Sequence, residues 1–132
     1  MSRRDGPPRW AAATTEHGRP GTDRDVRVIQ GTLEMLVLRT LVWGPNHGFG
    51  ILRHLETVTR DALIVEEGAL YPALHRMREK GWIEGEWSRT DNNRRALVYR
   101  LTAEGRAELR RQQASWSRAV EVVAAVLDPA LP

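Results

Sequence analysis

Hydrophobic residues in the first half of the chain recur every three or four positions, the spacing of one helix face. This pattern predicts three short helices, in residues 31–43, 47–58 and 66–81. Gly44 and Pro45 end the first helix, and Gly81 follows the last turn of the third. The apolar faces comprise Leu33, Leu36, Val37 and Leu41 in the first helix, Ile51, Leu52, Leu55 and Val58 in the second, and Leu70, Leu74 and Met77 in the third.

After Gly81 the hydrophobic pattern changes from helical spacing to alternation. In residues 82–87 the alternation places Ile83 and Trp87 on one face, and residues 96–101 alternate in the same way. The link between the two segments, SRTDNNRR, is rich in residues that tolerate turns and left-handed backbone. These features predict a β-hairpin with a basic tip.

The last segment is predicted to be one long helix, residues 103–127, with Thr102 as its N-cap and Pro129 beyond its end. At about 1.5 Å per residue such a helix is about 37 Å long, which is more than a domain of this size can cover. A heptad seam with one polar position runs along it, through Leu109, Gln113, Trp116, Val120, Val123 and Leu127. The seam packs either on its own domain or on a partner helix, and the length of the helix favours a partner.

The order of the elements predicts the fold. Three short helices followed by a β-hairpin are the parts of a winged helix-turn-helix, so we expect an α+β fold that is mostly α. We assign residues 28–101 to this domain and residues 102–128 to a C-terminal dimerisation helix. Residues 1–27 mix glycine, proline and charges of both signs without an apolar period, which is typical of a flexible tail. The connection between the second and third helices is longer than a minimal helix-turn-helix turn.

The charge balance is basic, and arginine carries almost all of it. Of the 20 Lys and Arg residues only Lys80 is a lysine, and the sequence pI is about 10.1. Guanidinium groups match phosphates and guanine edges, so this balance suits a nucleic-acid partner, although it also suits a solvated surface.

The chain has no cysteine, which excludes disulfides and thiolate metal sites and fits a reducing cytoplasm. Its longest apolar run, residues 35–43, is interrupted by Arg39 and is too short to span a membrane. No apolar segment of a secretory signal follows Arg3 and Arg4. We therefore expect a cytoplasmic protein that does not enter a membrane.

The third helix carries short, polar and basic residues on the face opposite its apolar stripe. A DNA major groove accepts such a helix, and Arg or His can contact base edges or phosphates there. A basic hairpin on the next element strengthens this interpretation over that of an ordinary solvated helix. The candidate DNA-binding residues are Ala69, Tyr71, Pro72, His75 and Arg76 on the third helix, Arg94 and Arg95 in the hairpin, and His47 before the second helix.

Pro72 lies inside the predicted third helix, where proline normally breaks the structure. If Gly68 is the N-cap, Pro72 is the fourth helical residue, and its missing N–H removes only the first intrahelical hydrogen bond. The ring would then present an apolar surface to the groove, against a thymine methyl group.

No catalytic or metal-binding motif accompanies these elements. The four serines lie outside any nucleophile motif, and neither a phosphate-binding loop nor a dinucleotide fingerprint is present. His47 and His54 lack a third ligand at metal spacing. Glu66 and Glu67 are adjacent and favour the positive end of the third helix over a carboxylate pair. We therefore expect no enzyme activity, no metal and no cofactor.

An ordered series of motifs extends over most of the chain: GTLEMLVLRTL, HGFGI, EEGALYPALHRMREKGWIEGEW and NNRRALVYRLTAEGR, followed by a Trp-bearing last helix. From about Val28 onwards the sequence resembles the PadR family of bacterial transcriptional regulators. The resemblance implies a winged-helix homodimer that represses transcription from a palindromic operator. Its partners would be double-stranded DNA and a second copy of the chain. The single C-terminal helix is similar to that of the short branch of the family, which responds to multiple drugs or phenolic compounds.

In that branch a Trp on the last helix lines a ligand-responsive cavity at the dimer interface, and SWSR at 115–118 resembles that element. The resemblance implies Trp116 and Val120 as contacts for a planar aromatic effector. The alternative is that Trp116 only packs in the dimer interface. The candidate interface residues from the seam are Leu109, Trp116, Val120, Val123 and Leu127.

Two positions depart from the family pattern. Ala69 stands where the family usually has Thr or Ser, and Phe49 stands where it commonly has Tyr. Each change removes a hydroxyl group and should lower operator affinity or shift operator preference. The alternative function is a winged-helix protein–protein interaction module without specific DNA binding, which would expose apolar groups on the third helix.

Overall fold

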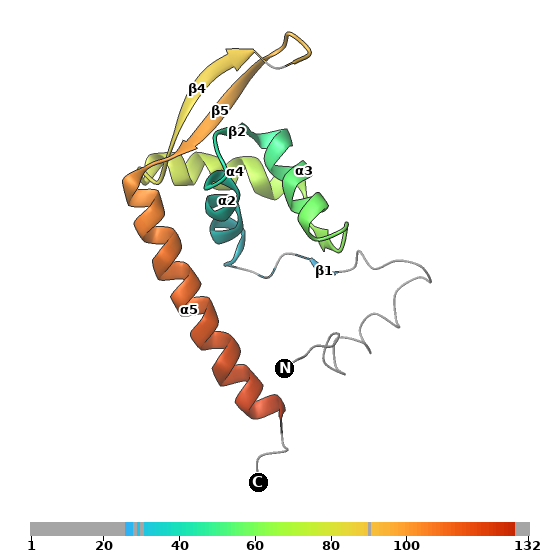
Figure 1. Cartoon of the computed structure of the whole chain (residues 1–132), viewed down its shortest axis with the longest axis vertical. Coiled ribbons are helices and arrows are strands. Elements are labelled where there is room, and N and C mark those ends of the chain that lie inside the picture. Colours follow the sequence, from blue (N-terminus) through green and yellow to red (C-terminus); the bar gives the residue numbers. More distant parts are fainter. Residues whose placement is uncertain (1–25, 28, 30, 90, 129–132) are drawn as a thin grey trace.

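Three short helices, a β-hairpin and one long helix follow one another in the predicted order (Figure 1). The computed structural model describes residues 26, 27, 29, 31–89 and 91–128. The helices are α2 (Leu33–Leu41), α3 (Gly48–Val58), α4 (Glu67–Glu79) and α5 (Ala103–Leu127), and the hairpin strands are β4 (Ile83–Arg89) and β5 (Arg95–Leu101). The winged helix-turn-helix prediction is confirmed, with α3 and α4 as the helix pair and the hairpin as the wing.

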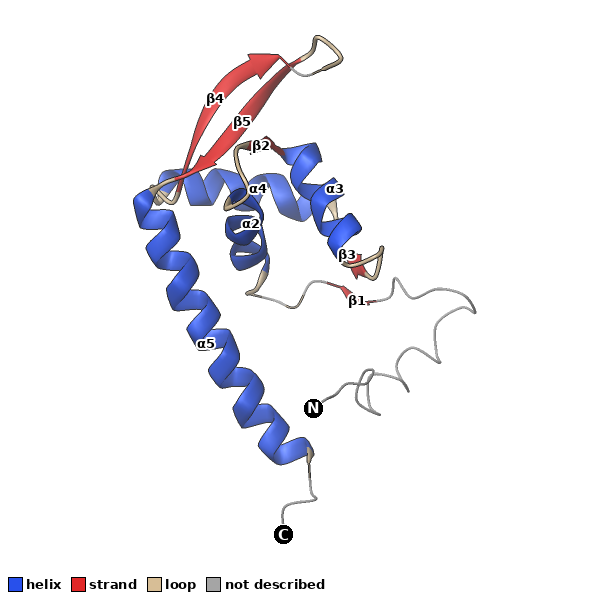
Figure 2. Ribbon diagram, viewed as in Figure 1, coloured by secondary structure: helices blue, strands red, loops and turns tan. Residues whose placement is uncertain are grey.

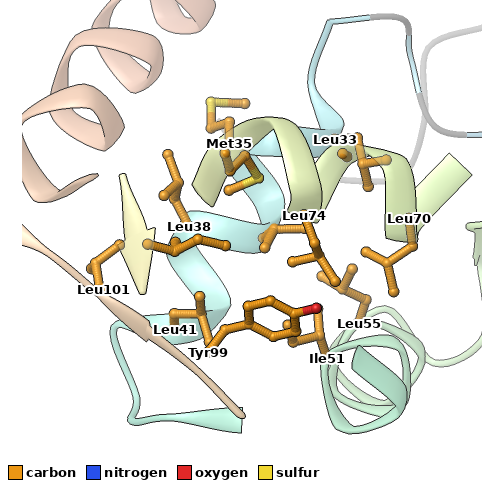
Figure 3. Packing of buried hydrophobic residues seen from close by; sticks show 14 of the residues in the cluster. Leu33, Met35, Leu38, Leu41, Ile51, Leu55, Leu70, Leu74, Tyr99 and Leu101 are labelled. Carbon is orange, nitrogen blue, oxygen red and sulfur yellow. The ribbon is translucent and has the colours of Figure 1, made fainter. Parts of the chain in front are cut away.

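The apolar faces of the first three helices meet in one core (Figure 3). The side chains that converge there include Leu38 and Leu41 from α2, Ile51 and Leu55 from α3, and Leu70, Leu74 and Met77 from α4. Burial of one such side chain stabilises the fold by about 1.5–3 kcal/mol. The three α4 residues are completely buried, so the core fixes which face of α4 remains outside.

The wing strands form the predicted hairpin and pair antiparallel, with Ile83 opposite Leu101, Gly85 opposite Tyr99 and Trp87 opposite Leu97. A further strand, β2 (Asn46–His47), pairs antiparallel with β5 and makes a sheet of order β2-β5-β4. The base of the wing is buried in the core, whereas its far end projects beyond the helices (Figure 2). The sheet therefore holds His47, just before α3, beside the wing.

A second strand pair joins the start of the domain to the link between α3 and α4. β1 (Val26–Arg27) lies parallel to β3 (Leu63–Ile64). β1 occupies the last two residues of the predicted tail, and the rest of that tail lies outside the described residues. Ahead of β3, Arg60 and Asp61 adopt left-handed backbone with φ of 52° and 64°. The link is longer than a minimal turn because it contains this strand.

Helix α4 begins before Gly68, and this corrects the account of Pro72, which took Gly68 as the N-cap. Its N-cap is Glu66, not Gly68, so Pro72 is the sixth helical residue. The first intrahelical bond, from Leu70 N to the Glu66 carbonyl at 3.2 Å, is intact. The N–H that Pro72 lacks would have bonded the Gly68 carbonyl, so the missing hydrogen bond lies within the second turn.

The junction between the wing and α5 is a single residue, Thr102. Its Oγ1 accepts a hydrogen bond from Gly105 N at 3.0 Å, which confirms the predicted N-cap. The same hydroxyl lies 2.6 Å from the Gly81 carbonyl and 2.9 Å from the Trp82 carbonyl, and Thr102 N donates to Trp82 O at 3.1 Å. The start of α5 is thereby fixed to the turn that precedes the wing.

Candidate nucleic-acid interface

The outer face of α4 displays the residues that the helical wheel places there. Ala69, Tyr71, Pro72, His75 and Arg76 are all exposed, in contrast to the buried stripe of the same helix. Because the stripe is fixed in the core, these five side chains share one accessible surface. We call this surface the recognition face.

Two members of the recognition face have partners within the protein. Arg76 Nε lies 3.6 Å from the Glu34 Oε2 of α2, and the Arg76 side chain is 54% exposed. His75 Nε2 lies 3.2 Å from Glu79 Oε2, one turn further along α4. The sequence does not reveal the Arg76 contact, because Glu34 lies far away along the chain.

The wing tip is braced by its own arginines. Arg89 Nη1 donates to the Asn93 carbonyl at 3.1 Å across the turn, where Asn93 has φ of 62°. The Arg95 guanidinium lies over the ring of Trp87, 4.6 Å from its centroid. Trp87 is itself 59% exposed, so the pair stands at the surface of the wing. The sequence pattern places Trp87 on the same face as Ile83 but does not reveal its stacking on Arg95.

An open cleft with a volume of about 970 Å³ separates the wing from the start of α3 and from Tyr71 of α4. The structure brings four of the candidate DNA-binding residues together at this cleft: His47, Tyr71, Arg94 and Arg95. The other four, Ala69, Pro72, His75 and Arg76, do not line it. The remaining lining residues are Gly48, Phe49, Trp87, Asp91, Asn92, Ala96, Leu97 and Tyr99.

Two ring side chains of the cleft, Tyr71 and His47, contact the backbone at the start of α3. The Tyr71 ring packs on Gly48, where a β-carbon would approach its hydroxyl to 2.8 Å. His47 caps α3, because its Nδ1 accepts a hydrogen bond from Gly50 N at 3.0 Å. Burial raises the pKa of Tyr99, although nearby Arg78 acts against this, so the phenol remains neutral. The cleft thus combines fixed aromatic rings with arginines of the wing.

A second cavity, with a volume of about 530 Å³, lies between the start of α2 and the middle of α5. We call it the α2–α5 cavity. Trp116, the candidate effector residue, lines it, whereas Val120 is not among its lining residues. The other lining residues are Gly31, Thr32, Glu34, Met35, Lys80, Trp82, Glu108, Arg111, Gln112, Ser115 and Ala119. The Glu108 carboxylate accepts hydrogen bonds from Arg111 and Gln112, which lower its pKa.

The seam of α5 divides into a buried start and an exposed remainder. Leu109 is 5% exposed and belongs to the core of its own domain. Trp116, Val120, Val123 and Leu127 are 39–52% exposed. Figure 2 shows this part of α5 extending away from the other helices.

The described residues include neither a candidate metal site nor a membrane-spanning helix. Among them there is no group of three His, Asp or Glu side chains that could hold a metal ion. None of the described helices is long and apolar enough to cross a membrane.

Comparison with known proteins gives consistent results. A family model, the transcriptional regulator PadR-like family, matches residues 37–111. A PadR-like transcription factor from Bacteroides fragilis is 30% identical, with a TM-score of 0.60 over 73% of this chain and 90% of that one. A PadR family regulator from Eggerthella lenta is 29% identical, with a TM-score of 0.64 over 76% and 85%. A transcriptional regulator from Clostridium thermocellum shares the fold at 24% identity, with a TM-score of 0.68 over 74% and 94%.

The matched region runs from within α2 through the recognition face and the wing to the first part of α5. It therefore covers more than half of the chain and includes all the elements that build the cleft. With this match, the chain belongs to the PadR-like family of transcriptional regulators, which are DNA-binding regulators and not enzymes.

Proposed function

We propose that this protein is a cytoplasmic repressor that binds a palindromic operator as a homodimer and is released by a small planar aromatic effector. One observation supports the operator-binding role above all. Tyr71 of the recognition face lines the same open cleft as Arg94 and Arg95 of the wing, so α4 and the wing both border it. A strand of DNA backbone fits such a cleft when the helix lies in the major groove.

In this arrangement the two elements contact different parts of the DNA. Pro72 and His75 of the recognition face meet base edges in the major groove. Arg94 and Arg95 lie along the backbone or in the adjacent minor groove, where guanidinium groups neutralise phosphates. Trp87 keeps Arg95 oriented, because the stacked guanidinium loses less freedom when it binds.

The exposed seam of α5 supports the homodimer. Trp116, Val120, Val123 and Leu127 expose apolar surface along one side of a 25-residue helix. A second copy of α5 would bury this surface and bring two recognition faces into a two-fold arrangement that matches a palindrome. Leu109 is already buried in its own domain, so the proposed contact runs from Trp116 to Leu127. On this basis we assign DNA binding to residues 28–101 and pairing with the second copy of the chain to residues 102–128.

The α2–α5 cavity supports the effector site. Trp116 offers a flat ring in a partly enclosed space, which suits a planar aromatic molecule. Val120 would join this site only through the pairing of two α5 helices. An effector there changes the spacing of the two recognition faces without touching either of them.

Binding to the DNA upstream of its own gene, measured across a salt series, tests this proposal. We expect a steep linear fall of log affinity with log salt, together with a preference of about 10³-fold or more over random DNA. A flat salt dependence without preference over random DNA would reject the repressor. That result would favour the alternative, a protein-interaction module, in which the exposed Phe49, Tyr71 and Trp87 bind a protein partner.

Pro72→Ala tests the contact of the proline ring with the groove. The substitution restores the N–H that can bond the Gly68 carbonyl, so we expect the free energy of unfolding to rise by about 1–3 kcal/mol. Loss of the ring should reduce discrimination between operator variants that differ in one thymine, as measured by fluorescence anisotropy. Pro45→Ala, which changes an exposed loop proline, serves as the control. Equal discrimination by both variants and the native protein would count against the thymine contact.

Trp116→Ala tests the two interpretations of that side chain. If it is the effector platform, the variant should bind operator in the absence of effector within about threefold of the native protein. Its affinity for a planar aromatic effector should fall by up to about tenfold, since one stacked aromatic contact contributes up to about 1.5 kcal/mol. Trp43→Ala, which removes an equally large but more exposed ring, is the matched control. Parallel loss of both activities with a changed far-UV spectrum would identify Trp116 as structural.

A further inference from the structure

Glu34, in the first turn of α2, belongs to two parts of the molecule. Its side chain lines the α2–α5 cavity together with Trp116. Its carboxylate also lies 3.6 Å from Arg76 Nε on the recognition face. The same carboxylate therefore lines the cavity and forms an ion pair with Arg76, a candidate DNA-binding residue.

The other charged side chains of the cavity contact residues that are near them in the sequence. Glu108 accepts hydrogen bonds from Arg111 and Gln112 on its own helix. Lys80 Nζ lies over the ring of Trp82, 4.6 Å from its centroid. By contrast, the ion pair of Glu34 leads out of the cavity to α4. A cationic ligand in the cavity would therefore lie near Glu34, the cavity carboxylate that is paired with a residue of another helix, α4.

The strength of the ion pair between Glu34 and Arg76 depends on how far the two charges are shielded from solvent. The side chain of Glu34 is only 21% exposed, so solvent screens it less than it screens a surface carboxylate. When a second cation approaches the same carboxylate, it competes with the first. The hold on Arg76, whose own side chain is half exposed, should weaken accordingly.

We propose that Glu34 couples the cavity to the recognition face: an organic cation with a flat aromatic ring binds between Trp116 and Glu34 and competes with Arg76 for the Glu34 carboxylate. This inference rests on the proposed effector site, and it adds the charge of the ligand and its route to α4. Coupling between two binding events is reciprocal, so the proposal makes a testable statement about the affinity for the cation. If the cation weakens the hold on Arg76, then removal of Arg76 must tighten binding of the cation.

Calorimetric titration of the DNA-free protein tests this consequence without interference from ligand binding to DNA. The probes are 1-methylquinolinium, a flat cation, and 1-methylnaphthalene, a neutral molecule of the same shape. We expect Arg76→Gln to bind the cation about fivefold more tightly, at the lower end of typical coupling, and Glu34→Gln to bind it about fivefold more weakly. The neutral probe should bind both variants and the native protein equally.

Arg78→Gln is the matched control, because it removes one positive charge from the same helix without touching Glu34. Its affinity for the cation should equal that of the native protein. Equal tightening by Arg76→Gln and Arg78→Gln would mean that only the general field of the helix matters, and the coupling would be rejected. Equal cation affinity in all variants would reject the role of Glu34 while leaving the effector cavity intact. Failure of both probes to bind the native protein would reject the cavity as an aromatic site, and the coupling with it.

Discussion

Val123→Asp should split the proposed homodimer and lower operator affinity by about 100-fold or more. Val123 lies in the exposed seam of α5, so in a pair of α5 helices it would be buried against its counterpart. An aspartate there would bring two like charges into an apolar contact. A monomer reaches only one half-site, so the gain from binding both halves of a palindrome is lost. Analytical ultracentrifugation and operator binding measure the two effects.

The chain offers a matched control for this substitution. Val126 is three residues further along α5 and is 79% exposed, but it lies outside the heptad seam. Val126→Asp should therefore leave both the assembly state and the operator affinity close to native. A native far-UV spectrum of Val123→Asp would show that the domain itself is still folded, since Val123 is not part of the hydrophobic core. A native Val123→Asp homodimer would contradict pairing through this seam.

Gly105→Ala should destabilise the domain by about 3 kcal/mol, the upper end of typical overpacking effects. A methyl group at Gly105 would overlap the carbonyl oxygen of Trp82. That oxygen is backbone and cannot rotate away, and it also accepts the hydrogen bond from Thr102 N. The first turn of α5 would have to move off the turn before the wing. Chemical denaturation measures the loss.

The same substitution at Gly68 should have the opposite sign. Gly68 lies in the first turn of α4, and a methyl group there would meet open space. Alanine reduces the conformational freedom of the unfolded chain, so Gly68→Ala should stabilise the protein by about 0.4–1 kcal/mol. Equal effects of the two substitutions would show that Gly105 is not constrained by Trp82.

The helices and the wing could be predicted because each buries a face with a regular period. The predicted last helix, residues 103–127, coincides with α5, and the two alternating segments form the hairpin as predicted. The strands β1, β2 and β3 were missed, because two residues are too few to show any period. The N-cap of α4 was placed two residues late, at Gly68, because glycine is a common cap and the side chain of Glu66 makes no capping hydrogen bond.

The sites were predictable to a smaller extent. Exposure of Pro72 and His75 follows from the helical wheel, because the core fixes the opposite stripe. The contacts of Arg76 with Glu34 and of Arg95 with Trp87 depend on how separate elements pack, which no local pattern encodes. The exposed fraction of the α5 seam likewise depends on where the domain ends, and only the structure separates Leu109 from the residues beyond it.

Because only Thr102 separates them, the wing and α5 should move together as one rigid unit. Strand β5 ends at Leu101 and α5 begins at Ala103, so no slack chain absorbs a rotation between them. Three backbone groups, the Gly81 and Trp82 carbonyls and the Gly105 amide, hold the pivot. A tilt of about 5° at the far end of a helix about 37 Å long corresponds to a displacement of about 3 Å. In the proposed homodimer, a small change in how the far ends of the two α5 helices meet would therefore move each wing tip. A shift of this size is comparable with the length of a contact to a phosphate.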